Sequence, residues 1–191
     1  MAFSAFLDAC VLVPIALTDT LLRLAEADTY RPLWSDEVLG EVERNLPKVS
    51  RTVTPAKARR RIDMMRTHFP DALMTGYEAL IPIMTNDSRD RHVLAAAIRG
   101  DAAVIVTANL DDFPTNALQP YDITAVHPDD FLLDQLDLHP RATVHCMHEQ
   151  IMAYNNPAMN IAEFLEHFSG TVPKFADAVG SLLLGDREQT D

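Results

Sequence analysis

Carboxylate side chains stand where apolar segments of this sequence break or end. Asp8 interrupts the apolar run at 5–13, Asp90 opens the helix predicted before the apolar run at 102–107, and Asp112 follows that run. Carboxylates that gather in one place repel one another unless a hard cation neutralises them, and their oxygens suit Mg²⁺ or Mn²⁺. Such an ion can activate water and stabilise an in-line displacement at phosphorus. The pattern therefore favours metal-dependent phosphodiester chemistry.

A second group of acids lies on the helix that we predict after Ser35. Glu37 and Glu41 are four residues apart and share one helical face. Glu41 borders the apolar side of that helix better than Glu43, which we expect to face solvent. Glu41 is therefore the candidate ligand on this helix, although a solvated face explains all three glutamates as well.

Each of the other polar residues also has a structural explanation. Asp8 could accept hydrogen bonds from backbone amides at a turn, because a lone buried acid must be paired or bound to a metal. Asp90 could be an ordinary helix N-cap, with Asp87 as the alternative acid on the preceding loop. Asn109 and Asp112 could be turn residues. The prediction depends on all of these residues meeting at one edge of a sheet.

Other catalytic patterns are absent from the sequence, which has no GxGxxG, GxxxxGK[ST], GxSxG or HExxH motif. His145 and His148 are three residues apart, but they lack a third ligand and we expect a surface pair. Cys10 and Cys146 are far apart with no CxxC spacing, so we expect two small buried side chains rather than a disulfide or a zinc site.

The charge of the chain is unevenly distributed. The formal net charge is −12, which is unusual for a protein that binds nucleic acid. Residues 44–66 nevertheless hold eight Lys and Arg residues, and Asp63 is the only acid among them. This segment could attract a phosphate backbone, although a solvated helix face is the alternative.

The candidate site needs elements that bring these residues together, and the apolar pattern predicts them. We expect strands at 5–13, 33–34, 79–84, 102–107 and 123–126. Helices are expected between them, at 14–28, 36–46 closed by Pro47, 55–69, 90–100 and 128–138. Strands that alternate with helices predict an α/β fold with a parallel sheet, in which ligands bind beyond the carboxyl ends of the strands.

The segment after Pro140 has a different pattern. Residues 141–185 look purely helical, with breaks at 155–157 and 170–173, and we expect a helical extension packed on the α/β part. We place the α/β domain at 1–138 and the extension at 139–191. No run approaches the roughly 20 apolar residues that span a membrane, and the first residues lack a signal-peptide pattern. We therefore expect a cytoplasmic protein.

Four segments together resemble the PIN-domain nucleases, in the bacterial branch that carries a C-terminal helical extension. They are FLDACVLVP, SDEVLGEVERNL, DRHVLAAAIRGDAAVIVTANLDDFP and HPDDFL, in matching order from residue 5 to about 138. The resemblance implies a three-layer α/β/α fold with a central parallel sheet, a divalent metal and endoribonuclease activity. Many such proteins are the toxins of toxin–antitoxin pairs, so it also implies an RNA substrate and a small antitoxin protein; a homodimer is left open.

The resemblance carries over to individual residues. Its three motif acids fall on Asp8, Glu41 and Asp90. The fourth acidic position falls on Asn109, which departs from the strictest pattern, and Asp112 could supply the missing carboxylate. The metal set is thus Asp8, Glu41, Asp90 and Asp112, with Mg²⁺ or Mn²⁺ as the ion. Asn109 would hold a water or a phosphate oxygen, and Thr107 could orient the attacking water.

Basic residues would guide the RNA to this site. Arg91, beside Asp90, could pair with a carboxylate or a phosphate, and the helix predicted at 55–69 would supply Lys57, Arg59, Arg60 and Arg61. RNA binding through such residues should depend strongly on salt. Single-stranded or looped RNA is the expected substrate, because its backbone is accessible.

Two other functions stay open. One is a non-catalytic PIN-like module that binds RNA or protein, in which the carboxylates only stabilise the fold; metal-dependent turnover would separate the two. The other is a small phosphatase with Asp8 as nucleophile. The second function is disfavoured because Cys10, rather than a second aspartate, stands two residues after Asp8.

Overall fold

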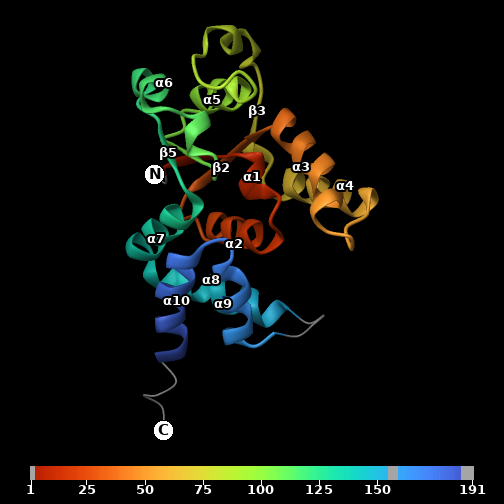
Figure 1. The fold of residues 1–191 in the computed structure, drawn as a ribbon, viewed down its shortest axis with the longest axis vertical. Helices are drawn as coiled ribbons and strands as arrows, with labels where there is room; N and C mark the ends of the chain where they lie inside the picture. The colour runs from red at the N-terminus through yellow and green to blue at the C-terminus, as the bar shows by residue number, and fades with distance from the viewer. Residues whose placement is uncertain (1–2, 155–158, 186–191) are drawn as a thin grey trace. The chain divides into compact units, whose positions relative to one another are not determined.

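The computed structural model describes residues 3–154 and 159–185 (Figure 1). The chain divides into two compact units, and each is built from segments that are distant in sequence. Unit 1 comprises residues 1–14 and 30–127, and unit 2 comprises residues 15–29 and 128–191. Among the described residues, no helix is long and apolar enough to cross a membrane.

Unit 1 is built on a parallel sheet with strand order β3-β2-β1-β4-β5. The strands are β1 (Ser4–Leu7), β2 (Arg31–Ser35), β3 (Leu73–Met74), β4 (Val104–Val106) and β5 (Thr124–Val126). Phe6 of β1 lies between Leu33 of β2 and Ile105 of β4, and all three are fully buried. Strands β2 and β3 extend the sheet on one side of β1, and β4 and β5 extend it on the other side. The boundary between β1 and β4 is therefore the point where polar groups at the strand ends can face a ligand.

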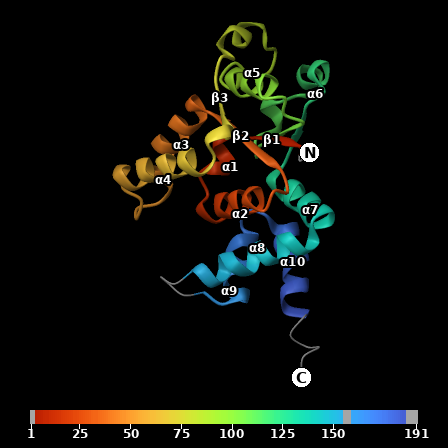
Figure 2. The ribbon, with the colours of Figure 1, turned by 180° about the vertical axis from the view of Figure 1, so that it is seen from behind.

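Helices cover this sheet, and one of them, α3, carries Glu41. They are α1 (Ala9–Leu12), α3 (Asp36–Val49), α4 (Pro55–His68), α5 (Arg91–Arg99) and α6 (Thr115–Leu118). Helix α5 packs on β1, β2 and β4 through a fully buried apolar face, and α3 packs on β2 and on α4 (Figures 1 and 2). The α/β fold with a central parallel sheet is thus confirmed.

Short 3-10 turns fill the longer connections of unit 1. They are η1 (Pro70–Ala72), η2 (Glu78–Ile83), η3 (Leu110–Asp112) and η4 (Gln119–Tyr121). The strand predicted at 79–84 is wrong, because these residues form η2, and the short strand β3 lies earlier in the chain. Pro82 removes a backbone donor that a sheet would use, and a 3-10 turn tolerates that loss.

Two other element boundaries also differ from the prediction. The first strand ends at Leu7 rather than continuing to residue 13, because Asp8 accepts a hydrogen bond from the Ala9 amide and starts α1. Pro47 does not close α3, which continues to Val49. The predicted start of this helix after Ser35 is confirmed, and the Ser35 hydroxyl caps it by accepting from the Val38 amide at 3.2 Å.

Unit 2 is helical and contains α2 (Ile15–Glu26), α7 (Pro128–Leu138), α8 (Pro140–Ala153), α9 (Ile161–Ser169) and α10 (Pro173–Gly185). The predicted helical C-terminal segment is confirmed for the described residues, and the break predicted at 155–157 lies outside them. Helix α2 packs on α8, where the Thr20 hydroxyl donates to Oε1 of Gln150 at 2.7 Å. The buried carboxylate of Asp129 accepts from the Lys174 and Phe175 amides and so caps the start of α10.

Candidate functional site

The buried carboxylate of Asp8 lies at the carboxyl end of β1, beside the end of β4. The Asp8 side chain is 4% exposed, and its backbone amide continues the sheet by donating to the Val106 carbonyl. Its Oδ1 accepts from the Ala9 amide at 2.6 Å, and its Oδ2 accepts from the Thr107 hydroxyl at 2.8 Å. The predicted residues Asp8 and Thr107 are thus in direct contact, although they are 99 positions apart.

Cys10 joins the same contact. Its thiol donates to Oδ2 of Asp8 at 3.1 Å and accepts from the Ala108 amide at 3.2 Å. Burial, and then the charge of Asp8, raises the pKa of this thiol to about 12, so it remains protonated at neutral pH. Cys10 and Cys146 are both free thiols. The expectation that Cys10 is only a small apolar side chain is wrong, because its sulfur bridges two strand ends.

Asp90 stands at the N-cap position of α5, yet its side chain makes no capping hydrogen bond. The alternative that Asp90 is an ordinary helix N-cap therefore does not hold. Burial is the largest reason that the pKa of its carboxyl rises to about 6. The negative charges of Asp8, Asp112 and Asp87 add to this rise, in that order. Asp90 thus stands close to three other acids, a crowding that a cation would relieve.

Three acids of unit 1 lie close enough to share one ion. Asp87, Asp90 and Asp112 each offer a carboxylate oxygen, and these oxygens lie within 4.8 Å of one another. Asp87 comes from the loop before α5, and its backbone amide donates to the Asp112 carbonyl at 3.2 Å. Hydrogen bonds from Arg89 lower the pKa of the Asp87 carboxyl. Sequence reasoning treated Asp87 only as an alternative to Asp90, and the structure places both beside Asp112.

Glu41 lies on α3 and is in contact with His92 of α5. Its Oε1 is 3.4 Å from Nε2 of His92, while Oε2 of Glu37 is 3.2 Å from Nδ1 of the same ring. Burial lowers the pKa of the His92 imidazole, but the two glutamates outweigh it and the pKa is raised. Glu41 is not one of the three acids that share an ion position. From the sequence, His92 lies beside Asp90 but is more easily explained as a core or surface histidine, and its contact with Glu41 is seen only in the structure.

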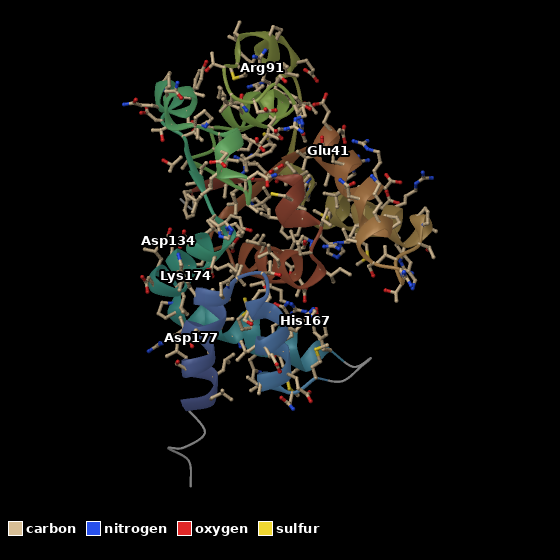
Figure 3. All side chains as sticks on the ribbon, in the orientation of Figure 1. Glu41, Arg91, Asp134, His167, Lys174 and Asp177 are labelled. Atoms are coloured by element: carbon tan, nitrogen blue, oxygen red, sulfur yellow. The ribbon has the colours of Figure 1, made fainter. Side chains whose placement is uncertain are left out.

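Asn109 and Arg91 lie at the edge of the same region. The backbone amide of Asn109, just after β4, donates to the Thr107 hydroxyl at 3.1 Å. The Asn109 side chain is exposed. Nε of Arg91 donates to the Asn86 carbonyl at 3.5 Å. Figure 3 shows Glu41 and Arg91 on α3 and α5, with side chains of unit 1 between them. Asn109 thus follows the strand end that contacts Asp8, and Arg91 follows Asp90 directly in sequence.

The predicted RNA-binding residues of α4 differ in how far their charges are already engaged. Nε of Arg59 is 3.1 Å from Oε1 of Glu43, and Nζ of Lys57 donates to the Thr52 carbonyl. Arg61 donates to the Leu12 carbonyl at 3.3 Å and is partly buried. Arg60 is exposed and, with Arg59, lines a recess of about 380 Å³ at the start of the helix.

Comparison with known proteins identifies what the two parts of this chain are similar to. The family model described as "PIN domain" matches residues 4–111, and the model described as "VapC50 C-terminal domain" matches residues 128–181. A protein of Mycobacterium tuberculosis (strain ATCC 25618 / H37Rv), named "Putative ribonuclease VapC50", is 49% identical over 114 residues. That alignment covers 58% of this chain and 68% of the relative. No solved structure matches the chain.

Proposed function

Because this chain belongs to the PIN-domain family, we propose that it is a metal-dependent endoribonuclease and the toxin of a toxin–antitoxin pair. The observation that carries the proposal is the convergence of Asp87, Asp90 and Asp112 near the buried Asp8, at the point where the sheet reverses its strand order. The name of the mycobacterial relative supports the same activity.

The donor set fits Mg²⁺ or Mn²⁺. All three close ligands are carboxylate oxygens, which hard divalent cations prefer. The raised pKa of Asp90 also fits, because a cation would favour the ionised carboxylate that burial and neighbouring charges now oppose. Bound there, the ion would supply the charge that activates a water and stabilises negative charge at phosphorus.

The residues near this ion would then have different roles. Asp87, Asp90 and Asp112 would hold the ion, and Asp8, the next acid at the end of β1, would be a fourth ligand. Thr107 donates its only hydroxyl proton to Asp8, so we assign it to positioning this carboxylate rather than to orienting a water. The Asn109 side chain is exposed and neutral, so its amide NH₂ group could donate to a phosphate oxygen without repelling it.

Glu41 and the basic side chains would act at the periphery. Glu41 would contribute through its contact with His92, either to the ion's outer hydration shell or to the alignment of α3 with α5. Arg60, Arg59, Lys57 and Arg61 of α4, together with Arg91, would attract the RNA backbone. A small antitoxin protein is the proposed partner. We also propose that two copies of the chain form a dimer, and the molar mass from light scattering would test this.

Cleavage of a mixed RNA pool tests the activity. The purified protein, free of any partner, should cut RNA with Mn²⁺ or Mg²⁺ and lose the cut with EDTA. Asp90→Asn should reduce the rate at least 100-fold, since it removes a ligand charge. The matched control is Asp101→Asn, which removes the same charge just beyond the opposite end of α5, where a positive φ of 53° suits asparagine. If the folded protein fails to cut RNA with either metal, the non-catalytic module becomes the better account.

A further inference from the structure

The side chain of Cys10 links the two strand ends that frame the proposed site. Its thiol donates to Oδ2 of Asp8 at 3.1 Å, at the end of β1. The same sulfur accepts from the amide of Ala108 at 3.2 Å, just after β4, and lies 3.3 Å from the Thr107 hydroxyl. Within the part of the chain that the structure describes, the Cys10 sulfur is the one side-chain atom that hydrogen-bonds to both Asp8 and the Ala108 amide.

The hydrogen bonds of Asp8 determine which of its oxygens still has an open lone pair. An ionised carboxylate offers about four lone-pair positions over its two oxygens. Oδ2 accepts from both the Thr107 hydroxyl and the Cys10 thiol, which fills it. Among the described residues, Oδ1 accepts one hydrogen bond, from the Ala9 amide, so it keeps one open position. The two donors on Oδ2 therefore fix the rotation of the carboxylate and leave Oδ1 as the oxygen for a ligand.

We propose that Cys10 is a positioning residue for the Asp8 carboxylate. The thiol holds Oδ2 and the Ala108 amide together, and so presents Oδ1 to the ion of the proposed site. This inference rests on the proposed function, because it assigns Cys10 a role toward that ion. Removal of a residue that hydrogen-bonds to a metal ligand typically weakens metal binding about 10–100-fold.

Three substitutions at Cys10 distinguish the effect of losing its hydrogen bonds from the effect of changing its side-chain volume. Cys10→Ala removes the donor and acceptor, and Cys10→Val removes them while filling a volume close to that of the thiol. Both should weaken Mn²⁺ binding about tenfold or more, as expected for a lost partner of a ligand. Cys10→Ser keeps a hydroxyl that can donate and accept, so it should recover most of the affinity.

Mn²⁺ affinity is read from the electron paramagnetic resonance signal of the free ion, at one pH and below the melting temperature of every variant. Cys146→Ala is the matched control, because it makes the same thiol-to-methyl change in unit 2, where the thiol donates to the Arg23 carbonyl at 3.6 Å. This control should bind Mn²⁺ like the unsubstituted protein. A purely structural role for Cys10 would lower the melting temperature without changing the dissociation constant.

Each outcome decides the inference. Weak binding in the alanine and valine variants, with recovery in the serine variant, supports it. Unchanged binding in the alanine and valine variants overturns it and leaves the proposed function intact, as does a serine variant that binds as weakly as alanine. Absence of Mn²⁺ binding in the unsubstituted protein refutes the metal site itself, and the role of Cys10 toward the ion falls with it.

Discussion

At the scale of single residues, the crowded acids should make the metal-free protein sensitive to pH through Asp90. The pKa of this carboxyl is raised from 3.8 to about 6 by burial and by neighbouring acids. The folded state therefore holds a proton that the unfolded state releases. The stabilising contribution is complete below pH 3.8 and is lost as the pH rises through about 6. At pH 7 the ionised Asp90 destabilises the metal-free fold.

Asp90→Asn should therefore raise the free energy of unfolding at pH 7 in EDTA, while it removes metal binding. Urea unfolding at pH 5 and pH 7, with and without Mn²⁺, measures both effects. The difference between the variant and the unsubstituted protein should shrink at pH 5, where Asp90 is largely protonated. A variant that is less stable than the unsubstituted protein at pH 7 in EDTA would show that the Asp90 carboxylate is not under repulsion.

Glu41 and Asp112 should contribute unequally to metal affinity. Asp112 belongs to the set of three oxygens within 4.8 Å, whereas Glu41 contacts His92. We expect Asp112→Asn to weaken Mn²⁺ binding at least tenfold and Glu41→Gln to weaken it less, because outer partners act indirectly. Titration of Mn²⁺ into each variant measures this, with Glu37→Gln as the control on the same face. Equal losses at Glu41 and Asp112 would place the ion closer to α3.

The sequence indicates the residue types of this site better than their contacts. Asp8, Asp90 and Asp112 attract attention because each stands at the border of an apolar segment. The contact of Cys10 with Ala108 and the role of Asp87 depend instead on distances across the sheet and between loops. Such contacts are set by the folded chain, and no local pattern in one sequence contains them.

At the scale of elements, continuous apolar runs predict the central strands, but not where each strand stops. The run at 5–13 continues past β1 because the buried helix α1 is as apolar as the strand. A side-chain hydrogen bond at Asp8 ends the strand, and hydrophobicity does not report it. The apolar run at 79–84 shows the same ambiguity, since short apolar runs suit turns and strands alike.

Gly100 allows the C-terminal end of α5 to approach β2 and β3. A Cβ at this position would lie 2.6 Å from Cδ1 of Leu33 and 2.8 Å from Sδ of Met74. Gly100→Ala should therefore lower the free energy of unfolding by about 1–3 kcal/mol through overpacking. The control is Gly185→Ala, whose Cβ would meet nothing within 4 Å. Urea unfolding compares them, and equal stabilities would mean that α5 shifts away from the sheet without penalty.

Helix α4 should contribute to RNA affinity through charge alone. Arg60 is exposed at the recess near the start of the helix, so Arg60→Gln should weaken binding of a non-cleavable RNA and reduce its salt slope by about 1. Arg31→Gln removes the same charge from the exposed start of β2 and serves as the control. Binding is measured by fluorescence anisotropy between about 50 and 200 mM salt, the range over which phosphate contacts weaken. Equal slopes in all three proteins would remove α4 from the RNA path.

At the scale of the whole molecule, the two units are not two consecutive pieces of chain. Helix α2 follows β1 and α1 closely in sequence, yet it belongs with the helices after residue 127. The alternation of strands and helices predicts α2 as an ordinary part of the α/β pattern. Its membership in unit 2 comes from packing on α8, including the contact of Thr20 with Gln150, 130 positions away.

Removal of the C-terminal helices should therefore damage a segment that lies near the N-terminus. A chain ending at His127 lacks α8, so the buried face of α2, including Leu17, Leu21 and Leu24, loses the helix on which it packs. An isolated 12-residue helix is marginal in water, so we expect α2 to unfold and the fragment to associate. Amide hydrogen exchange of residues 15–29 and light scattering measure these two effects.

Two further proteins make this test specific to packing. Co-expression of residues 128–191 should restore slow exchange in α2, because it returns the missing helices. In the full chain, Leu21→Ala should lower the free energy of unfolding by about 2–5 kcal/mol, whereas Leu182→Ala, at a leucine that is 44% exposed, should lower it far less. A monomeric fragment with a protected α2 would show instead that unit 1 holds this helix without the C-terminal segment, and the division of the chain would then follow the sequence order.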